Sequence, residues 1–367
     1  MPIDEYKFGS VQITRGCPFT CEFCDIIVVF GRRPRIKTAA QVIAELDQLL
    51  TMNKRNVFIV DDNMIGNKKA IKPVLREIIA WQRAHGYPMS FGTESSIDLA
   101  EDDELMKLMV EANITAVFVG IETPSDAALR ETKKIQNLDD SRGTMLEKVH
   151  RIQQAGMEVW SGMIVGFDSD DGSVFELQRR FIQDAQIINT MVNMLVAIPK
   201  TPLFARLEKE GRLDHSDAAF QRGTNVIPRQ ITPSELYAGC AALMRDIYEP
   251  AAYFERLDAL YLERRLRPGI ARSRYLRRHP LRWLAANLRL LVESTVIIIQ
   301  LMRKIPDAAL RHEYRRRLWR TARRRFEPAV LQVYAMKCAL HYHSYMIARQ
   351  MLSTAAAAAD SFQDAAE

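Results

Sequence analysis

The sequence has little cysteine, with five in 367 residues, and no long apolar run. The first ten residues, MPIDEYKFGS, contain no apolar core, so we expect no secretory signal. The most apolar window is 281–302, and its longest stretch without a charged side chain is the nine residues 294–302. A membrane span needs roughly 20 predominantly apolar residues, so we expect no transmembrane helix in this window.

The composition is that of an ordinary globular protein, with 48% hydrophobic and 26% charged residues. This mixture excludes a disordered chain, a collagen and a disulfide scaffold. Charge is nevertheless unevenly distributed. Residues 264–325 contain 19 basic and 3 acidic side chains, a net charge of +16, which leaves −10 for the rest of a chain whose total is +6. The acidic body and the basic C-terminal segment are therefore expected to serve different purposes.

Six strand-like runs, each followed by a helical pattern, fill the first 210 residues. The runs are 11–14, 57–60, 90–93, 116–121, 159–165 and 194–198. They lack clear alternation of polar and apolar residues, which predicts strands buried on both faces. Successive strand–helix units predict a parallel sheet, and six units rather than eight predict an α/β fold with an open, partial (β/α)6 barrel. In such a barrel the chemistry lies at the carboxyl ends of the strands.

After about residue 228 the strand signals stop and helical patterns follow. We therefore expect three regions along the chain. These are a barrel over 1–230, an α-helical, arginine-rich C-terminal extension over 231–352, and a disordered tail over 353–367.

Three of the five cysteines, Cys17, Cys21 and Cys24, lie within eight residues directly after the first predicted strand. They are too close for ordinary disulfide pairing, and they indicate a metal site in a reducing compartment. Three thiolates can hold three irons of a [4Fe–4S] cluster and leave the fourth iron open. An open iron can chelate a molecule with an amine beside a carboxylate, as in S-adenosylmethionine. Structural zinc is the alternative, but zinc takes four ligands and no second cysteine pair follows.

The spacing C-x3-C-x2-C, with Phe23 before its third cysteine, resembles the radical S-adenosylmethionine superfamily. The resemblance implies a [4Fe–4S] cluster held by the three cysteines and S-adenosyl-L-methionine bound at successive strand ends. The implied cofactor-binding residues are Phe23, Asp61, Asp62, Asn63, Glu94, Glu122, Gly162, Ile164, Gly166 and Pro199. It further implies an enzyme that reductively cleaves S-adenosylmethionine and abstracts hydrogen from an unactivated carbon. No residue is assigned a catalytic role of its own.

Each strand-end element also has a structural interpretation. The acidic residues can cap a helix or form salt bridges, and the glycines can allow a strand and a helix to pack closely. Because these residues recur at successive strand ends, where barrel active sites are assembled, we favour the functional interpretation.

The sequence resembles one branch of the superfamily in particular, the cobalamin-linked branch that includes the hopanoid C-2 methylases. Three runs carry this resemblance: CDIIVVFGRRPR from Cys24, FIVDDNMIGN from Phe58 and YEPAAYFERL from Tyr248. Members of this branch carry an N-terminal cobalamin-binding domain. We expect this chain to lack it, because only 16 residues precede Cys17 and no D-x-H-x-x-G motif occurs. The resemblance implies a lipid or isoprenoid substrate of hopanoid type, with C-methylation and cobalamin as further implications.

Arginine clusters flank the apolar window 281–302 within the basic segment 264–325. This arrangement is typical of a helix that lies on an anionic membrane surface, so we expect a cytoplasmic protein with peripheral contact to the inner face of the membrane. One alternative is an RNA contact, which the sparse aromatic side chains disfavour. Another is a solvated basic surface whose apolar helix packs on the barrel.

The implied partners are an electron donor, such as a flavodoxin or ferredoxin, and a lipid-like small molecule. Two other functions stay open at this point. One is radical modification of RNA or of another small molecule, and the other is a non-enzymatic protein that binds a cluster or zinc.

Overall fold

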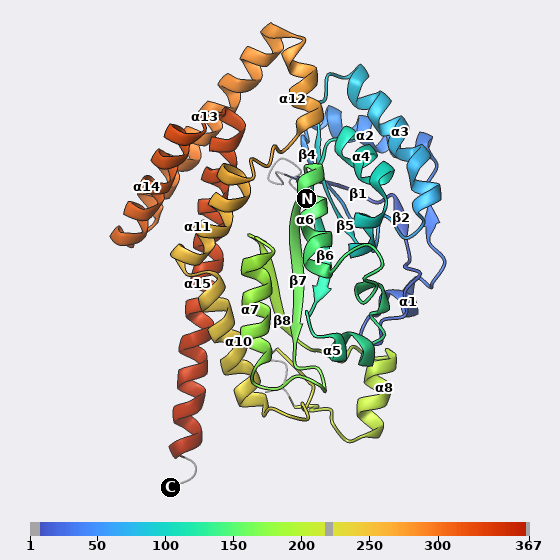
Figure 1. Ribbon diagram of the computed structural model, residues 1–367, viewed down its shortest axis with the longest axis vertical. Helices are drawn as coiled ribbons and strands as arrows, with labels where there is room; N and C mark the ends of the chain where they lie inside the picture. Colours follow the sequence, from blue (N-terminus) through green and yellow to red (C-terminus); the bar gives the residue numbers. More distant parts are fainter. Residues whose placement is uncertain (1–7, 217–222, 365–367) are drawn as a thin grey trace.

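The computed structural model describes the backbone of residues 8–216 and 223–364, and side chains as far as residue 355. Its centre is a sheet of six parallel strands in the order β1–β4–β5–β6–β7–β8. The strands are β1 (Phe8–Val11), β4 (Asn56–Ile59), β5 (Ser90–Ser95), β6 (Ile114–Glu122), β7 (Glu158–Val165) and β8 (Thr190–Met194). The sheet curls into a half-barrel (Figure 1), which confirms the predicted partial (β/α)6 barrel. The first and last strands begin three and four residues earlier than predicted.

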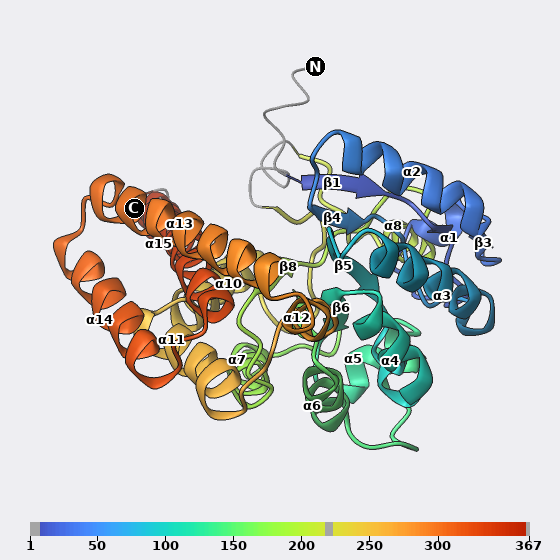
Figure 2. The same ribbon diagram turned by 90° about the horizontal axis from the view of Figure 1, so that it is seen from above.

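Helices between the strands cover the convex face of the sheet (Figure 2). They are α2 (Ala39–Thr51), α3 (Lys68–Ala84), α4 (Asp103–Glu111), α6 (Met145–Ala155) and α7 (Val174–Asp184). Thr38 and Thr144 begin α2 and α6 with reciprocal capping boxes, which satisfy backbone N–H groups that the first turn leaves free. Shorter elements lie at the strand ends: β2 (Thr14–Arg15), α1 (Ile26–Val29), β3 (Arg35–Ile36), η2 (Ile97–Glu101), α5 (Asp126–Glu131), η3 (Ile135–Asn137) and α8 (Pro202–Lys209).

Only one face of the sheet is covered. Along β5, Phe91, Thr93 and Ser95 are buried, whereas Gly92 and Glu94 are half-buried. Because alternate residues of a strand point to opposite faces, the second set lines the concave face. The prediction of strands buried on both faces is therefore wrong for β5, whereas β6 and β7 have buried residues in both alternating sets. The sequence conceals the alternation because apolar and small residues occupy the open face as well.

The C-terminal part is helical, as expected, and it shares one hydrophobic core with the barrel. Its elements are α10 (Pro233–Ile247), α11 (Pro250–Asp258), the π turn η4 (Ala259–Glu263), α12 (Ile270–Arg277), α13 (Pro280–Lys304), α14 (Ala308–Arg324) and α15 (Pro328–Asp364). The backbone of α15 is helical as far as Asp364, and residues 365–367 lie outside the described residues. The disordered tail over 353–367 stays a prediction.

A buried charge cluster joins these helices to the sheet at Glu158, the first residue of β7. Its carboxylate forms an ion pair with Lys337 of α15 and accepts hydrogen bonds from Tyr261 Oη at 2.5 Å and Trp160 Nε1 at 2.8 Å. Both charged side chains are more than nine-tenths buried. A buried pair of this kind is held by its additional hydrogen bonds, and removing one partner leaves an uncompensated charge.

The helix α13 corrects one expectation. Its 25 residues make it long and apolar enough to cross a membrane by length and composition, and no other helix in the described part of the chain passes that test. The absence of charged residues was too strict a criterion for a possible membrane span, because α13 contains Arg289 and Glu293 among apolar neighbours and still passes the test of length and composition. One such helix is weak evidence for a span, and α13 packs one face on α15.

We predict that Lys337→Met destabilises the protein by about 3 kcal/mol, because Glu158 keeps a buried charge without its cation. Urea unfolding followed by circular dichroism measures the loss. The matched control is Arg349→Met, which removes an exposed cation from the same helix and should leave the midpoint in place. Equal midpoints for Lys337→Met and wild type would show that the ion pair does not hold the extension to the sheet.

Candidate functional site

The cysteine loop follows β2 and ends at β3. It is closed by backbone contacts, since Cys17 N donates to Gly31 O at 3.4 Å and Cys24 N donates to Cys21 O at 3.2 Å. Gly16 adopts φ +96°, and a Cβ there would lie 2.9 Å from Gly31 O. This turn therefore requires glycine directly before the first cysteine.

Amide groups from two other loops point at the sulfurs. Asn63 Nδ2 lies 3.9 Å from Cys17 Sγ, and Gln136 Nε2 lies 3.6 Å from Cys21 Sγ. Burial raises the pKa of Cys17, and it raises the pKa of Cys24 to about 11. Cys17 and Cys24 are thus protonated before a metal binds, and binding must release their protons. N–H groups directed at sulfur are the surroundings that a thiolate-ligated iron–sulfur cluster requires, so these residues fit such a group.

Within the described residues, no three His, Cys, Asp or Glu side chains form a group arranged around a single metal ion.

Asp61 and Asp62 follow β4, where we expected cofactor-binding residues, and both bind backbone. Asp61 Oδ1 accepts from Ile13 N at 2.7 Å and Thr14 N at 2.9 Å, and Asp62 Oδ2 accepts from Gly16 N at 2.7 Å. The two carboxylates therefore fix the segment that leads into the cysteine loop. They do not cap the next helix, which was the structural alternative. Asp61 is buried, its Oδ2 has no partner in the described structure, and burial raises its pKa to about 6.

Glu94, near the end of β5, faces the same region from the neighbouring strand. Burial raises its pKa to about 7, and the carboxylates of Asp62 and Asp61 add to that rise. None of the three carboxylates forms an ion pair within the described ranges 8–216 and 223–364. Three neighbouring acids without a cation form a site that a bound ammonium group would stabilise.

The sequence analysis missed Lys134, which lies between η3 and α5 and pairs with Glu122 at the end of β6. Lys134 Nζ lies 2.7 Å from Glu122 Oε1 and 5.8 Å from the centre of the Phe23 ring. Burial alone would lower the pKa of Lys134, but Glu122 and the sulfurs of Cys21 and Cys24 outweigh it and raise the pKa. The site therefore contains a permanent cation beside the cysteine loop. In the sequence, Lys133 and Lys134 resemble two lysines exposed to solvent, and nothing marks Lys134 as part of a site.

Glu122 itself is strained. It adopts φ +63°, in the left-handed region that non-glycine residues rarely occupy. A Cβ at Gly120 would contact Glu122 Oε1 and Lys134 Nζ, so a larger residue there would displace the ends of the two paired side chains. Backbone strain held in this way is typical of functional sites.

The other predicted cofactor-binding residues are two apolar side chains, two glycines and a proline. Phe23 and Ile164 pack against a small apolar cluster around Phe167, whose ring centre is 6.2 Å from that of Phe23. Gly166 adopts φ +101°, and a Cβ there would lie 2.9 Å from Leu236 of α10, so its glycine serves strand–helix packing. A Cβ at Gly162 would lie 3.1 Å from the ring of Phe118. Pro199 is exposed.

The concave face beside this site is apolar and open. Phe8 is 61% exposed, Met191 is 59% exposed and Val60 is 44% exposed. Phe58 and Phe118 cover the glycines at positions 92 and 162 of the neighbouring strands. Phe8 and Met191 lie on the two edge strands and Val60 follows β4, so exposed apolar side chains are spread across the open face of the sheet. An exposed apolar face is a candidate binding surface for an apolar group.

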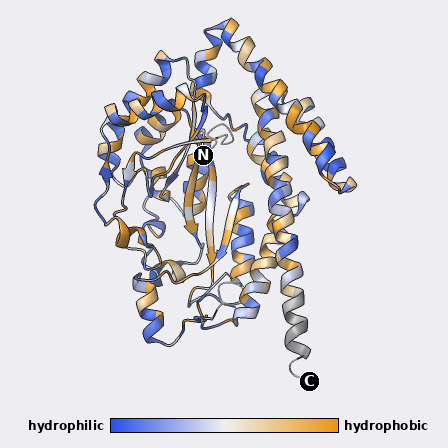
Figure 3. Ribbon diagram, turned by 180° about the vertical axis from the view of Figure 1, so that it is seen from behind, coloured by the Kyte–Doolittle hydropathy of each residue, from blue (hydrophilic) through white to orange (hydrophobic). Residues whose placement is uncertain are grey.

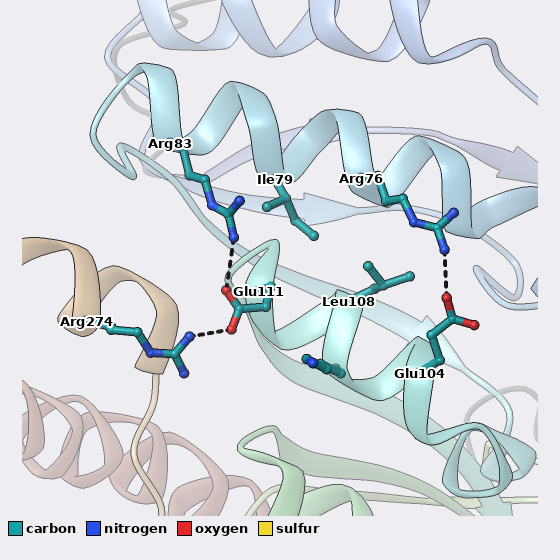
Figure 4. A pocket seen from close by; sticks show the side chains of 8 residues that line it. Arg76, Ile79, Arg83, Glu104, Leu108, Glu111 and Arg274 are labelled. Carbon is teal, nitrogen blue, oxygen red and sulfur yellow. Dashed lines mark hydrogen bonds and ion pairs between the residues drawn. The ribbon is translucent and has the colours of Figure 1, made fainter.

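A pocket lies on the convex side, between α3, α4 and the start of the C-terminal helices at α12 (Figure 4). Its two carboxylates are paired with lining arginines, since Glu111 pairs with Arg274 at 2.6 Å and Arg83 at 3.6 Å, and Glu104 pairs with Arg76 at 2.7 Å. These contacts join helices and leave no chemistry to assign.

Comparison with known proteins gives two family matches. Residues 11–180 match the Radical SAM superfamily, and residues 201–357 match a domain of unknown function, DUF4070.

Three relatives are informative. The chain is 43% identical over 268 residues to an uncharacterized methyltransferase, sll1242, of Synechocystis sp., which covers 72% of this chain and 49% of that protein. It is 33% identical over 347 residues to a hopanoid C-2 methylase of Rhodopseudomonas palustris, covering 94% of this chain and 62% of that protein. It is 27% identical to an anaerobic magnesium-protoporphyrin IX monomethyl ester cyclase of Cereibacter sphaeroides over 66% of this chain and 39% of that protein. The chain thus spans less than two thirds of the length of each of these relatives.

We predict that Glu94→Gln stabilises the protein by about 1–2 kcal/mol at pH 8 and has little effect at pH 5, after solvent screening of a half-buried group. The folded-state pKa of Glu94 is raised to about 7 from its usual 4.5, so the folded protein binds the extra proton between these values. Ionisation therefore lowers stability as the pH rises through this window. Thermal unfolding across pH 5–8 measures the difference.

The matched control is Glu77→Gln on the exposed face of α3, which should leave the pH profile unchanged. A Glu94→Gln profile parallel to that of wild type would mean that Glu94 titrates normally and that the three acids do not repel one another.

Proposed function

The chain belongs to the radical S-adenosylmethionine superfamily, and from this premise we propose that it reductively cleaves S-adenosylmethionine and abstracts hydrogen from an unactivated carbon of an apolar lipid. The observation that carries the proposal is the carboxyl edge of the sheet, where three thiols and three acids without a cation come together. The superfamily match over residues 11–180 includes both groups. The open apolar face of the sheet extends from this edge toward the amino ends of the strands.

The chain's residues divide the work at this edge. Cys17, Cys21 and Cys24 would hold a [4Fe–4S] cluster, and Asn63 and Gln136 direct N–H groups at two of the sulfurs. When bound, the cluster and S-adenosylmethionine supply the one-electron chemistry that produces the hydrogen-abstracting radical. Lys134 keeps a cation beside the thiolates, which favours their charged form.

The acids provide the second half of the site. Glu94 and the free oxygen of Asp62 offer negative charge to the ammonium of the amino-acid moiety of S-adenosylmethionine. Asp61 Oδ1 accepts from the backbone of Ile13 and Thr14, so we assign this oxygen to positioning the cysteine loop, while the unpartnered Oδ2 adds negative charge to the same site. Phe23 and Ile164 contribute the apolar wall around Phe167, which excludes water from that side.

The concave face suits a substrate that is itself apolar. Phe8, Val60 and Met191 are exposed there without polar partners, and burying them against a hydrocarbon would be favourable. An isoprenoid lipid of the hopanoid type has this character, and the relative from Rhodopseudomonas palustris is named a hopanoid C-2 methylase.

Methyl transfer to the same carbon is the second candidate function. It is favoured by the names of two relatives, a methyltransferase at 43% identity and a methylase at 33% identity. The assays below are therefore run with and without added cobalamin, and methylated product separates the two candidates.

The first test uses anaerobically reconstituted protein, dithionite as reductant and S-adenosylmethionine. We expect 5′-deoxyadenosine from wild type and at least a hundredfold less from Cys21→Ala, because the cluster loses a ligand. Cys240→Ala, which changes a buried cysteine of α10, is the matched control and should retain activity. Protein that takes up zinc without sulfide, and forms no nucleoside, would contradict the proposal.

The second test addresses the substrate class. Met191→Glu should abolish the stimulation of cleavage by lipid extract while leaving the slow lipid-independent cleavage intact, because it places a charge on the apolar face alone. Leu177→Glu, an equally drastic change at an exposed position of α7 on the convex side, should behave like wild type. Unchanged lipid stimulation in Met191→Glu would remove the concave face from the substrate site.

A further inference from the structure

We propose that α13 docks the protein on an anionic membrane surface through an apolar stripe that faces outward. This outer stripe consists of Leu281, Leu284, Leu288, Val292, Val296 and Ile299. Their exposed fractions run from 83% at Leu281 to 45% at Ile299. Helix α13 lies at the edge of the molecule, away from the sheet (Figure 2), and apolar residues run along it (Figure 3).

The stripe is continuous because its members recur every three or four residues, which places them on one side of a helix. From Leu281 to Ile299 it extends about 27 Å at the rise of an α-helix. The opposite side packs on α15, with Ser294 and Leu301 buried. Glu293 ties that side to α15, since it accepts from Gln332 Nε2 at 2.5 Å, and Arg289 one turn earlier in α13 pairs with the same carboxylate.

Positive charge lies at both ends of the stripe. Arg277, Arg278 and Arg282 precede or begin it, and Arg303 and Lys304 end it. Among the residues described, none of these five side chains forms an ion pair with an acid. An apolar helix face between unpaired cations is complementary to acyl chains below anionic headgroups, and this complementarity selects the partner.

An exposed aromatic side chain on α14 supports the same partner. Trp319 is 66% exposed, and Arg323 lies 5.9 Å from its ring. Tryptophan beside arginine is typical of the level of lipid headgroups.

Other occupants fit less well. A second copy paired through α13 would bring arginine clusters together in either orientation, and like charges repel. RNA would use the cations but has no use for six aliphatic side chains. A membrane span would require α13 to separate from α15 and break the contacts of Glu293.

The test is co-sedimentation of the full chain with vesicles of phosphatidylcholine alone or with 30% phosphatidylglycerol. We expect binding to the anionic vesicles and at least about tenfold weaker binding to the neutral ones, because two or more cations near the surface contribute about 1 kcal/mol each. Leu284→Glu/Leu288→Glu should reduce binding to the anionic vesicles by at least tenfold. Arg277→Ala/Arg278→Ala should remove most of the preference for anionic lipid.

Met52→Glu/Leu177→Glu is the matched control, with two exposed apolar residues changed on the barrel helices. It should bind like wild type, and the unfolding midpoints of all variants should agree. Four results would overturn the proposal: equal binding by Leu284→Glu/Leu288→Glu and wild type, a dimer that this variant dissociates, tRNA binding at 150 mM salt without vesicle binding, or retention in cell membranes after alkaline carbonate extraction. Cleavage of S-adenosylmethionine without lipid is independent of this surface, so the two proposals can fail separately.

Discussion

The cysteine loop depends on two carboxylates that come from a different strand. Asp61 and Asp62 follow β4 and accept hydrogen bonds from the backbone of Ile13, Thr14 and Gly16, which leads directly into the first cysteine. Charge-assisted hydrogen bonds to backbone N–H are among the stronger contacts in proteins, so the loop is positioned before any cofactor binds. Asp61 meets the backbone through Oδ1 alone, so its unpartnered Oδ2 and the carboxylate of Glu94 are the oxygens left to meet a ligand.

The fold followed from local patterns, whereas the site residues were proposed from motifs and stay predictions. Strand–helix alternation was sufficient to predict the half-barrel, because parallel sheets require helical crossovers. The motif positions predicted where Cys17, Glu94 and Glu122 would lie, yet not what each side chain would contact. We expected Asp61 to contact the ligand, and the structure shows its Oδ1 accepting hydrogen bonds from the backbone of Ile13 and Thr14. A carboxylate that follows a strand can make either contact. The backbone contact depends on the register of β1 against β4, which the sequence does not reveal.

Lys134 was beyond reach of sequence reasoning for a related reason. Its partner Glu122 is 12 positions away, and their contact depends on a left-handed residue and on the turn at η3. The open face of the sheet was missed because Phe8, Val60 and Met191 are apolar whether they pack in a core or face a ligand. A hydrophobic pattern shows that a side chain favours an apolar environment, but it does not show whether the core or a ligand provides that environment.

The single core that runs from the sheet into α10–α15 has an evolutionary consequence. Tyr253, Tyr314 and Cys338 belong to the same packed interior as Val159 of the sheet, and the cation that pairs with Glu158 within the described part of the chain is Lys337 of α15. The C-terminal helices are therefore not a detachable module that recombination could exchange between barrels. An ancestor that acquired or lost them would have had to rebuild the outer strands of its sheet at the same time, which ties the inheritance of the two halves together.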